Sequence, residues 1–388
     1  MSKIEELIYQ HCPDGVEFKK LAEVCKFQRG NSITQKDVTN GNVPVIAGGQ
    51  KPSYYHNMPN RSGETIAISG SGAYAGFVSY WMIPVFLSDS FSVNPDKESL
   101  ITRYVYYFLK CNQDKIHATK KGSGVPHVHG SSIAKFQIPV PPLPIQQEIV
   151  NILDKFTSLE AELEAELEAR HAQYKYYRDQ LLCFEGEEVE WKMLGEVGEF
   201  TRGRRFVKDD IVAEGFPCIH YGEMYTHYKI WAKESKSYLE PALAAKLRVA
   251  HPGDVIIVSA GETIEDIGNG VAWLGESDIV IHDACFTFSH SLNPKYVSYY
   301  LQTNLFRSQI KRYISSGKIS SINAPGLRKA KIPVPPMAEQ ERIVGILDKF
   351  DALVNDISVG LPAEIAARRK QYEYYREKLL TFKNVNNG

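Results

Sequence analysis

Ile138-Pro139-Val140-Pro141-Pro142 occurs a second time in this chain of 388 residues, as Ile332-Pro333-Val334-Pro335-Pro336. The sequence Ile-Leu-Asp-Lys-Phe repeats at the same offset, at 152–156 and at 346–350. The pattern Gln-Tyr-x-Tyr-Tyr-Arg, at 173–178, returns at 371–376, four residues later than that offset predicts. Because self-similarity of this kind fixes the architecture, the chain is predicted to be a tandem repeat.

A second pair of matching stretches opens the two halves of the repeat. Glu17-Phe18-Lys19 and Arg29-Gly30 correspond to Glu190-Trp191-Lys192 and Arg202-Gly203. The stretch 4–9 then corresponds to the end of the helix before the second half, so the duplication is cut inside a helix and the chain ends are expected to lie close together. Between the shared stretches the halves diverge, as recognition of two different targets requires.

Each proline stretch leads into a segment with the apolar spacing of a coiled coil. The stripe includes Ile149, Ile152 and Phe156 in the first copy, and Ile346 and Phe350 in the second. Packing of each helix on its own domain is the alternative, but two such stripes favour an antiparallel pair. About 40 residues at roughly 1.5 Å each give a rod on the order of 60 Å.

Charges on the two helices are arranged for this pairing. Three acidic residues of the first helix are expected near three basic residues of the second, although a solvated acidic face is the alternative. The groups are Glu160, Glu162 and Glu164, and Arg368, Arg369 and Lys370. Gly360-Leu361-Pro362 marks the four inserted residues and is expected to interrupt the second helix, because proline removes a helix hydrogen bond.

The overall charge argues against DNA binding until it is divided by segment. The chain has 45 Lys and Arg against 46 Asp and Glu. The segment 145–190 carries a net charge of -8, while 1–144 and 191–338 carry +4 and +3. No apolar run reaches the roughly 20 residues of a membrane span, and the six separated cysteines are expected to be reduced, so a cytoplasmic location is predicted.

Motifs for catalysis are weak in this sequence. Gly70-Ser71-Gly72-Ala73-Tyr74-Ala75 matches a dinucleotide-binding pattern, but a strand is expected after it where such a site needs a helix. His127-Val128-His129 is expected to belong to a loop and not to bind a metal ion. We therefore predict no catalytic residues, no metal and no cofactor in this chain, with a dinucleotide-binding enzyme kept as an alternative.

Basic, amide, hydroxyl and aromatic side chains gather in the loops of both halves. Such side chains neutralise phosphates and read base edges, although each one alone is equally typical of a solvated surface. The candidate DNA-binding residues of the first half are Arg29, Asn31, Lys36, Gln50, Lys51, Tyr54, Tyr55, Arg61, Ser71, Tyr74, Lys120, Lys121 and Ser123. Those of the second half are Arg202, Arg204, Arg205, Lys208, Tyr221, Tyr225, Lys229, Ser316 and Lys318.

The repeated opening, the repeated proline stretch and the long helix after it resemble the specificity subunit of type I restriction-modification systems, over essentially the whole chain. The resemblance implies an α+β chain with two mixed α/β target recognition domains, joined by two long helices that form an antiparallel coiled coil, in a pseudo-two-fold tandem repeat. The implied boundaries are 1–144 and 185–338 for the recognition domains, 145–184 and 339–382 for the spacer helices, and 383–388 for a tail.

The family also implies a function. Each recognition domain is expected to bind one half of a split, asymmetric site in double-stranded DNA, and the helices to set the spacing. Two methyltransferase subunits and the restriction motor-nuclease subunits are the expected partners; S-adenosylmethionine, ATP and Mg are expected in those subunits. Candidate partner-binding residues are Tyr176, Arg178, Tyr374 and Arg376. A structural scaffold that does not read DNA is the remaining alternative.

Overall fold

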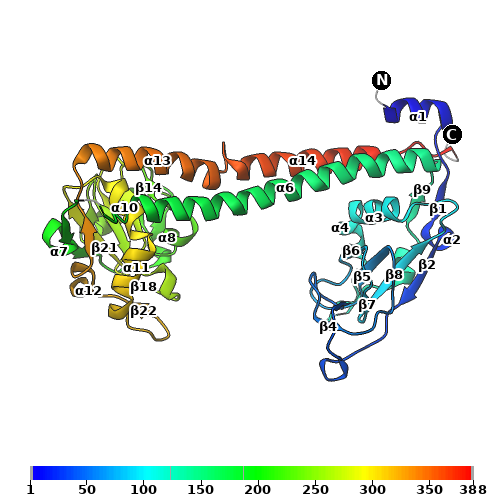
Figure 1. Cartoon of the computed structure of the whole chain (residues 1–388), viewed down its shortest axis with the longest axis horizontal. Helices are drawn as coiled ribbons and strands as arrows, with labels where there is room; N and C mark the ends of the chain where they lie inside the picture. Colours follow the sequence, from blue (N-terminus) through cyan, green and yellow to red (C-terminus); the bar gives the residue numbers. More distant parts are fainter. Residues whose placement is uncertain (1–2, 123, 187, 386–388) are drawn as a thin grey trace. The chain divides into compact units, whose positions relative to one another are not determined.

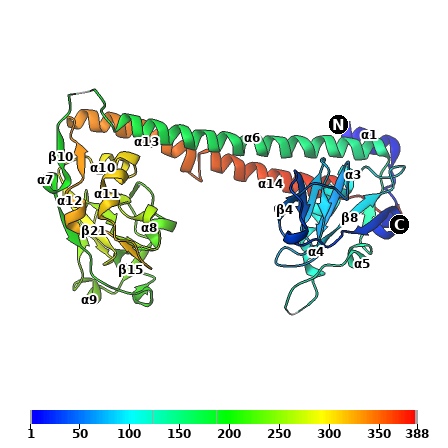
Figure 2. The ribbon, with the colours of Figure 1, turned by 60° about the horizontal axis from the view of Figure 1, so that its bottom comes forward.

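The computed structural model describes residues 3–122, 124–186 and 188–385. The chain divides into two compact units, one made of Met1–Glu164 with Glu364–Gly388 and the other of Ala165–Ala363 (Figures 1 and 2). The first unit thus combines both ends of the chain. No helix among the described residues is long and apolar enough to cross a membrane.

The first unit contains a four-stranded and a three-stranded sheet, with strand orders β2-β8-β5-β6 and β4-β3-β7, and a short β1-β9 pair. Its strands are β1 Phe18–Lys20, β2 Cys25–Arg29, β3 Val43–Ile46, β4 Tyr54–His56, β5 Thr65–Ser69, β6 Val78–Trp81, β7 Phe86–Leu87, β8 Ser90–Pro95 and β9 Gln137–Pro139. Its helices are α1 Lys3–His11, α2 Leu21–Val24, η1 Gln35–Asp37, α3 Thr102–Cys111, α4 Gln113–Ala118, α5 Gly130–Ile133, the first part of α6 Leu143–Leu181, and α14 Leu361–Leu379.

The second unit contains two five-stranded sheets, β11-β21-β17-β19-β14 and β12-β15-β13-β20-β16, with the pairs β10-β23 and β18-β22. Its strands are β10 Trp191–Met193, β11 Gly198–Arg202, β12 Ile211–Val212, β13 Phe216–Ile219, β14 Trp231–Ala232, β15 Ser237–Leu239, β16 Val249–Ala250, β17 Val255–Val258, β18 Ala260–Gly261, β19 Gly270–Trp273, β20 Ile279–Ile281, β21 Cys285–His290, β22 Ser320–Ser321 and β23 Lys331–Pro333. Its helices are α7 Leu194–Val197, η2 Lys208–Asp210, α8 Glu223–Thr226, α9 Pro241–Ala244, η3 Ile264–Asp266, α10 Pro294–Leu301, α11 Asn304–Ile310, η4 Lys311–Tyr313, α12 Ala324–Arg328 and α13 Met337–Asn355.

The same core arrangement occurs in both units. The central strands β5 and β17 are buried along their whole length, which explains their continuous apolar sequences. Helices α3 and α10 cover these strands with buried tyrosines. Tyr104 donates a hydrogen bond to the Pro139 carbonyl, and Tyr296 donates one to the Pro333 carbonyl, each at 3.0 Å. The repeated proline stretch is therefore anchored by its own domain in each unit.

A buried glutamine joins each long helix to its domain. Gln146 accepts a hydrogen bond from the Ile101 N–H (2.9 Å) and donates to the carbonyls of Ser99 (2.8 Å) and Pro141 (2.7 Å). In the second unit Gln340 accepts from the Asn293 N–H and donates to the Pro335 carbonyl, both at 2.9 Å. The glutamine after each proline stretch therefore satisfies the backbone at the start of the helix.

An aspartate further along each long helix makes a second link between that helix and its domain. In the first unit the Asp154 carboxylate accepts from Arg103 Nε at 2.8 Å and from the Tyr107 hydroxyl. In the second unit Asp348 accepts from Lys295 Nζ and the Tyr299 hydroxyl, both at 2.7 Å. These aspartates belong to the repeated Ile-Leu-Asp-Lys-Phe sequence, so that repeat encodes attachment of helix to domain.

Antiparallel helix pairing is present in each unit. In the first unit the Phe156 ring lies 5.5 Å from that of Tyr375. In the second unit the equivalent pair is inverted, and Phe350 stacks on Tyr177 at 5.6 Å. Arg369 binds Glu160 at 2.5 Å and also Glu164, as the charge pattern predicted. Arg368 instead pairs with Glu364 of its own helix, and Glu162 accepts a hydrogen bond from Ser158.

The second long helix is broken, in agreement with the sequence. Helix α13 ends at Asn355 and α14 begins at Leu361, whereas α6 is continuous over 39 residues. A side chain at Gly360 would place a Cβ 2.4 Å from the Ala352 carbonyl oxygen, so the chain can turn back on α13 only with glycine here. The helices begin two residues earlier than the predicted 145 and 339, and they end at Leu181 and Leu379.

The two ends of the chain meet within the first unit. The Val16 N–H donates to the Lys383 carbonyl at 2.9 Å, and Lys3 pairs with Glu148 of α6 at 2.6 Å. The repeat offset predicted that the duplication is cut inside a helix and that the chain ends lie close together. The contacts of Lys3 with Glu148 and of Val16 with Lys383 agree with this prediction.

Candidate nucleic-acid interface

A tight turn follows β2 in the first unit, where the four-stranded and three-stranded sheets meet. The Gly30 N–H donates to the Ser90 carbonyl at 2.8 Å, and the Asn31 N–H donates to the Leu87 carbonyl at 2.9 Å. A Cβ at position 30 would lie 2.3 Å from the Leu87 oxygen, so glycine is required. The exposed side chains of Arg29 and Asn31 leave this turn on either side of the glycine.

Arg61 supports the turn through hydrogen bonds to its backbone. Its guanidinium group donates to Ser92 Oγ (2.9 Å) and to the carbonyls of Asn60 (2.7 Å), Gln28 (3.1 Å) and Arg29 (3.0 Å). Burial lowers the pKa of Arg61. Nε and both terminal nitrogens each donate a hydrogen bond inside the unit, and the DNA contact of Arg61 stays a prediction.

Other predicted residues of the first unit surround the same turn. Ser69 Oγ donates to the Ala47 carbonyl at 3.1 Å, which brings the loop of exposed Gln50 and Lys51 to the end of β5. Ser71 forms a β-bridge with His127, at the base of a hairpin in which Lys121 and His127 exchange backbone hydrogen bonds of 2.9 and 2.8 Å. Loops from four parts of the sequence therefore converge.

The other residues predicted to bind DNA in this unit lie in different surroundings. Tyr74 is exposed beside this hairpin, while Lys120 Nζ lies 3.4 Å from the Ala73 carbonyl oxygen. Lys36 and Tyr55 are exposed along the three-stranded sheet, where the Tyr54 hydroxyl donates to the Ile33 carbonyl at 3.1 Å. Ser123 lies outside the described residues.

A cavity of about 200 Å³ connects the turn and the hairpin. Its polar lining includes Arg29, Asp89, His127 and His129, and the two imidazole rings stack at 6.3 Å with an 8° angle between their planes. Asp89 also accepts a hydrogen bond from the Ser71 hydroxyl. Positive, negative and aromatic groups thus face one small space, an arrangement that suits hydrogen bonding to a base edge.

The glycine-rich loop 70–76 is part of this surface and does not have the form of a dinucleotide site. Strand β6 follows it, where a phosphate-binding loop leads into a helix. The N–H groups of Gly70, Gly72 and Gly76 donate to the carbonyls of Asp89, Pro126 and Ser69 at 2.8–3.0 Å. These backbone donors are therefore engaged within the protein.

The second unit repeats the tight turn after β11. The Gly203 N–H donates to the Cys285 carbonyl at 3.0 Å, and a Cβ there would lie 2.2 Å from the His282 oxygen. Two predicted DNA contacts are held against the backbone: Arg202 Nε donates to the Asp283 carbonyl (2.9 Å) and Arg204 Nη1 to the Lys246 carbonyl (2.8 Å). The next predicted contacts, Arg205 and Lys208, have exposed side chains.

A cluster of aromatic rings lies behind these basic residues. The His220 and His282 rings are 4.9 Å apart, and Tyr221, which is 39% exposed, lies 4.6 Å from His220 and 5.1 Å from His282. Each imidazole Nδ1 accepts a backbone N–H, from Gly222 (3.4 Å) and Ala284 (3.1 Å). Burial lowers the pKa of both histidines, which favours the neutral imidazoles. The planes of the two imidazole rings are inclined by 63° to each other and by 43° to the Tyr221 ring, so the three rings form a tilted aromatic cluster.

The last predicted residues of this unit divide into two groups. Ser316 and Lys318 are exposed on the hairpin closed by Ser315 and Ser321, the counterpart of the hairpin at 121–127. The Tyr225 hydroxyl donates to the Ala260 carbonyl at 3.3 Å beside that hairpin, and burial raises its pKa. Lys229 Nζ instead donates to the Asn355 carbonyl at 2.5 Å. The ammonium group of Lys229 thus binds the C-terminal end of α13, and its contact with DNA stays a prediction.

The candidate partner-binding residues differ in how exposed their side chains are. Tyr176 and Tyr374 are each 60% exposed, whereas their neighbours Tyr177 and Tyr375 stack on phenylalanines in the helix pairs. Arg178 is buried and binds Asp179 at 3.0 Å, and the partner contact proposed for it stays a prediction. Within each Tyr-Tyr pair the second tyrosine is less exposed than the first, at 41% for Tyr177 and 36% for Tyr375.

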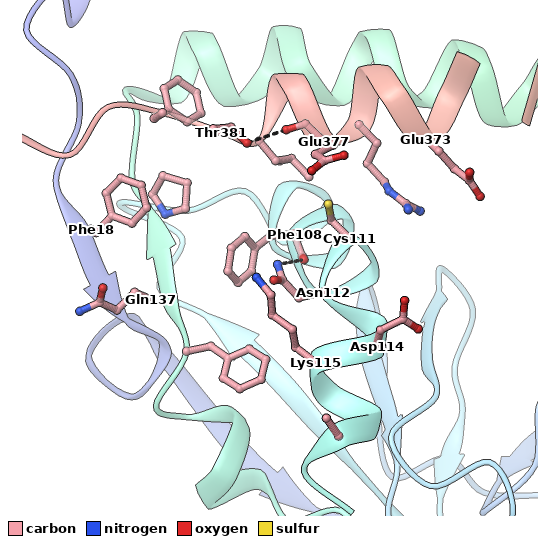
Figure 3. A pocket seen from close by; sticks show the side chains of 16 residues that line it. Phe18, Phe108, Cys111, Asn112, Asp114, Lys115, Gln137, Glu373, Glu377 and Thr381 are labelled. Atoms are coloured by element: carbon pink, nitrogen blue, oxygen red, sulfur yellow. Dashed lines mark hydrogen bonds between the residues drawn. The ribbon is translucent and has the colours of Figure 1, made fainter. Parts of the chain in front are cut away.

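Arg376 borders a cleft of about 1020 Å³ in the first unit (Figure 3). Glu373 and Glu377 enter the cleft from α14, and Asp114 and Lys115 enter from α4. Arg376 Nε is buried with no hydrogen-bond partner among the described residues, and its guanidinium carbon lies 5.1 Å from the Tyr372 ring centroid. The cleft is polar and mixed in charge, unlike the basic surface around Arg29.

A sequence profile described as "Type I restriction modification DNA specificity domain" matches residues 13–169 and, a second time, residues 186–367. The chain belongs to the type I specificity family. This specificity chain is 32% identical, over 98% of its length and 97% of the relative, to the Escherichia coli "Type I restriction enzyme EcoR124I/EcoR124II specificity subunit".

Solved structures of type I specificity subunits share this fold at 17% identity. One is the type I restriction-modification S subunit of M. genitalium, with a TM-score of 0.56, covering 94% of this chain and 96% of the other. A second comes from work titled as the structural basis of complex assembly and conformational transition of the type I system, with a TM-score of 0.64 over 94% and 97%. The predicted fold class is confirmed: two mixed α/β domains with two long helices in antiparallel pairing.

Several residues of the specificity domains were not predicted as site residues from the sequence. Arg248 donates to the Arg202 carbonyl at 2.6 Å, and Asp89 lines the cavity beside Arg29. His127, His129 and His282 were likewise absent from the predicted site. In the sequence, proximity to the repeated Arg-Gly pair could have indicated the loop residues of the site. The side chains that other strands contribute could not be identified, because this requires knowledge of the strand pairing.

Proposed function

We propose that this chain reads DNA sequence for a type I restriction-modification complex, with each unit binding one half of a two-part site in double-stranded DNA. The observation that carries the proposal is the double match to the DNA specificity domain, once in each unit. The two units share the turn after β2 or β11 and the later hairpin, while the side chains on these loops differ. A shared scaffold with different loops suits two different half-sites.

Three features support DNA as the ligand of these loops. Arg29, Asn31 and Arg205 are exposed beside the repeated turns, and arginine and asparagine make the bidentate contacts that distinguish guanine and adenine. Lys51, Lys121 and other lysines nearby supply charge for the phosphates. Tyr221 with its two histidines supplies an aromatic contact surface.

We further propose that the paired helices set the distance between the half-sites and bind two methyltransferase subunits, with motor-nuclease subunits joining for restriction. The exposed tyrosines Tyr176 and Tyr374, one on each long helix segment, support the docking role. In this scheme the methyltransferase subunits carry S-adenosylmethionine, the motor-nuclease subunits use ATP and Mg, and this chain supplies sequence recognition without catalysis.

A domain exchange tests the proposal. Residues 20–135 are replaced by the corresponding block of another specificity chain, and the protein is expressed with a methyltransferase partner while N6-methyladenine is mapped across the genome. One half of the modified sequence should change and the other half should stay. An unchanged sequence would contradict the proposal, and the reciprocal exchange in the second unit controls for loss of assembly.

A further inference from the structure

An arginine from outside the turn binds the same backbone position in both units. Arg61 Nη2 donates to the Arg29 carbonyl at 3.0 Å, and Arg248 Nη1 donates to the Arg202 carbonyl at 2.6 Å. These carbonyls are equivalent, because Arg29 pairs with Phe91 of β8 just as Arg202 pairs with Phe286 of β21. The repeated Arg-Gly pair is therefore held in the same way twice.

The two arginines come from equivalent places in the fold although the sequences around them do not match. Arg61 forms a β-bridge with Val85, and Arg248 directly precedes β16, which pairs with β20. In the first unit the Leu87 carbonyl, shortly after Val85, lies against Gly30. In the second unit the His282 carbonyl, directly after β20, lies against Gly203. In each unit one short segment thus contacts the turn through backbone packing while an arginine reaches it through hydrogen bonds.

We propose that Arg61 and Arg248 are positioning residues, which fix the turns so that Arg29 and Asn31 in the first unit, or Arg205 in the second, meet base edges in one geometry. The inference rests on the proposed function and assigns part of the specificity to residues that do not touch DNA. Hydrogen bonds weaken steeply as their angles worsen, so a turn that can shift discriminates poorly between bases.

Arginine is suited to this task and lysine is not. Arg61 spreads its donors over four oxygens from three segments, Gln28–Arg29, Asn60 and Ser92. A planar guanidinium group holds such acceptors in fixed directions, whereas an ammonium group keeps the charge but lacks the planar fork. Substitution by lysine therefore removes the positioning while leaving the charge of the surface unchanged.

The test uses Arg61→Lys and Arg248→Lys in the full chain, expressed with a methyltransferase partner and followed by mapping of N6-methyladenine. Arg61→Lys should relax the half-site of the first unit only, and Arg248→Lys that of the second only. Loss of one well-directed base contact should reduce discrimination roughly 5- to 150-fold at the affected positions.

Two arginines that hold helices serve as matched controls. Arg103 binds Asp154 in the first unit, and Arg307 Nη2 binds Asn269 Oδ1 at 2.6 Å in the second. Arg103→Lys and Arg307→Lys should leave both half-sites unchanged even where they lower the unfolding midpoint. A sequence change in these controls equal to that in Arg61→Lys would overturn the proposal, because loosening of the domain in general would then explain both.

A second set of variants covers the case in which Arg61→Lys does not fold. Ser92→Ala removes the Nε contact of Arg61 together with the bonds of the Ser92 hydroxyl to the Gln28 carbonyl and the Asn94 amide, and it leaves the other three Arg61 bonds in place. Arg248 is bound in an exposed position by one described hydrogen bond. If neither Ser92→Ala nor Arg248→Lys changes a half-site, the positioning role is refuted. Failure of the proposed function itself is distinguishable, because the unaltered chain would then direct no two-part modification at all.

Discussion

Single residues in the repeated Tyr-Tyr sequence have opposite roles. Tyr177 and Tyr375 pack against phenylalanines of the neighbouring helix and are partly exposed, while Tyr176 and Tyr374 are more exposed and have no such stack. The apolar stripe predicted this division from the sequence, because the packed tyrosines fall on the stripe and the others do not. Roles within such a pair can therefore be separated by experiment.

Tyr176→Ala and Tyr374→Ala should weaken binding of a methyltransferase subunit by about 10-fold each, since truncating an exposed aromatic anchor commonly costs more than 1 kcal/mol. The unfolding midpoint should not move. Titration calorimetry and thermal unfolding check the two expectations together. Tyr177→Ala and Tyr375→Ala serve as the comparison, and these should lower the unfolding midpoint because they remove a ring stack.

A buried histidine makes the second unit sensitive to acid. Burial lowers the pKa of His290 to about 4, and its Nε2 is buried without a hydrogen-bond partner among the described residues. In the unfolded chain the pKa returns to about 6.5. Below that pH the unfolded state binds a proton that the folded state does not, so stability falls as the pH decreases toward 4.

The free energy of unfolding should therefore drop by about 2 kcal/mol between pH 7 and pH 5 on account of this group. His290→Asn, which keeps an acceptor for the Leu292 N–H, should remove most of that dependence, and His227→Gln at an exposed position should not. Urea unfolding at the two pH values measures the difference. Equal pH dependence in His290→Asn and the unaltered chain would contradict the assignment.

Arginine roles show where reasoning from the sequence reaches its limit. Arg29, Arg61 and Arg178 look alike in a sequence, and all were predicted to contact DNA or a partner. The structure separates them, since Arg29 is exposed, Arg61 is bonded to the backbone and Arg178 is buried beside Asp179. The deciding groups come from strands and helices distant in sequence, so local sequence contains no signal for the difference.

At the level of elements, a single buried glutamine determines how each long helix starts. The Gln146 side chain is buried and satisfies one N–H and two carbonyls. The sequence predicted the helix and its proline entry, and it placed the start within two residues. It did not predict the glutamine, because a polar residue near a helix start is usually exposed.

Gln146→Leu should lower the free energy of unfolding of the first unit by about 2–4 kcal/mol, because it leaves buried backbone groups unpaired. Gln147→Leu, at the exposed neighbouring position, should change it by less than about 0.5 kcal/mol. Chemical denaturation of the two variants gives the comparison. Similar stabilities would show that water replaces the lost hydrogen bonds.

The break between α13 and α14 offers a test with two glycines. Gly360→Ala should destabilise the second unit by about 1–3 kcal/mol, since the new Cβ would clash with the Ala352 and Leu353 carbonyls. Gly345→Ala, within α13 where no atom lies within 4 Å of the added Cβ, should instead stabilise by about 0.5–1 kcal/mol. Opposite shifts in the thermal midpoint are expected, and a gain from Gly360→Ala would mean that the break is not required.

For the whole molecule, the near-neutral total charge is the sum of an acidic segment and two weakly basic blocks. The surplus of +4 and +3 in the two blocks is small for a protein that must hold DNA by itself. Segment counting predicted this from the sequence. It could not show that Arg202 and Arg204 are partly used within the protein, which reduces the number of free cations further.

DNA binding by the isolated chain should therefore be weak and should decrease with salt. A plot of log affinity against log salt has a slope of about -0.9 per neutralised phosphate, and we expect it to steepen when methyltransferase subunits are added. Fluorescence anisotropy over a range of NaCl concentrations measures both slopes. Tight, specific binding by the chain alone at physiological salt would contradict this expectation.

The contact between Val16 and Lys383 has a consequence for synthesis. The second unit is one uninterrupted segment, 165–363, but the first lacks α14 until the C-terminal residues have been made. At roughly 5–20 residues per second, its early part waits on the order of 10 to 45 seconds for helix α14 and the C-terminal residues that complete it. During that interval the apolar side of the first half of α6 is unpaired, so co-translational folding should depend on chaperone binding to this helix.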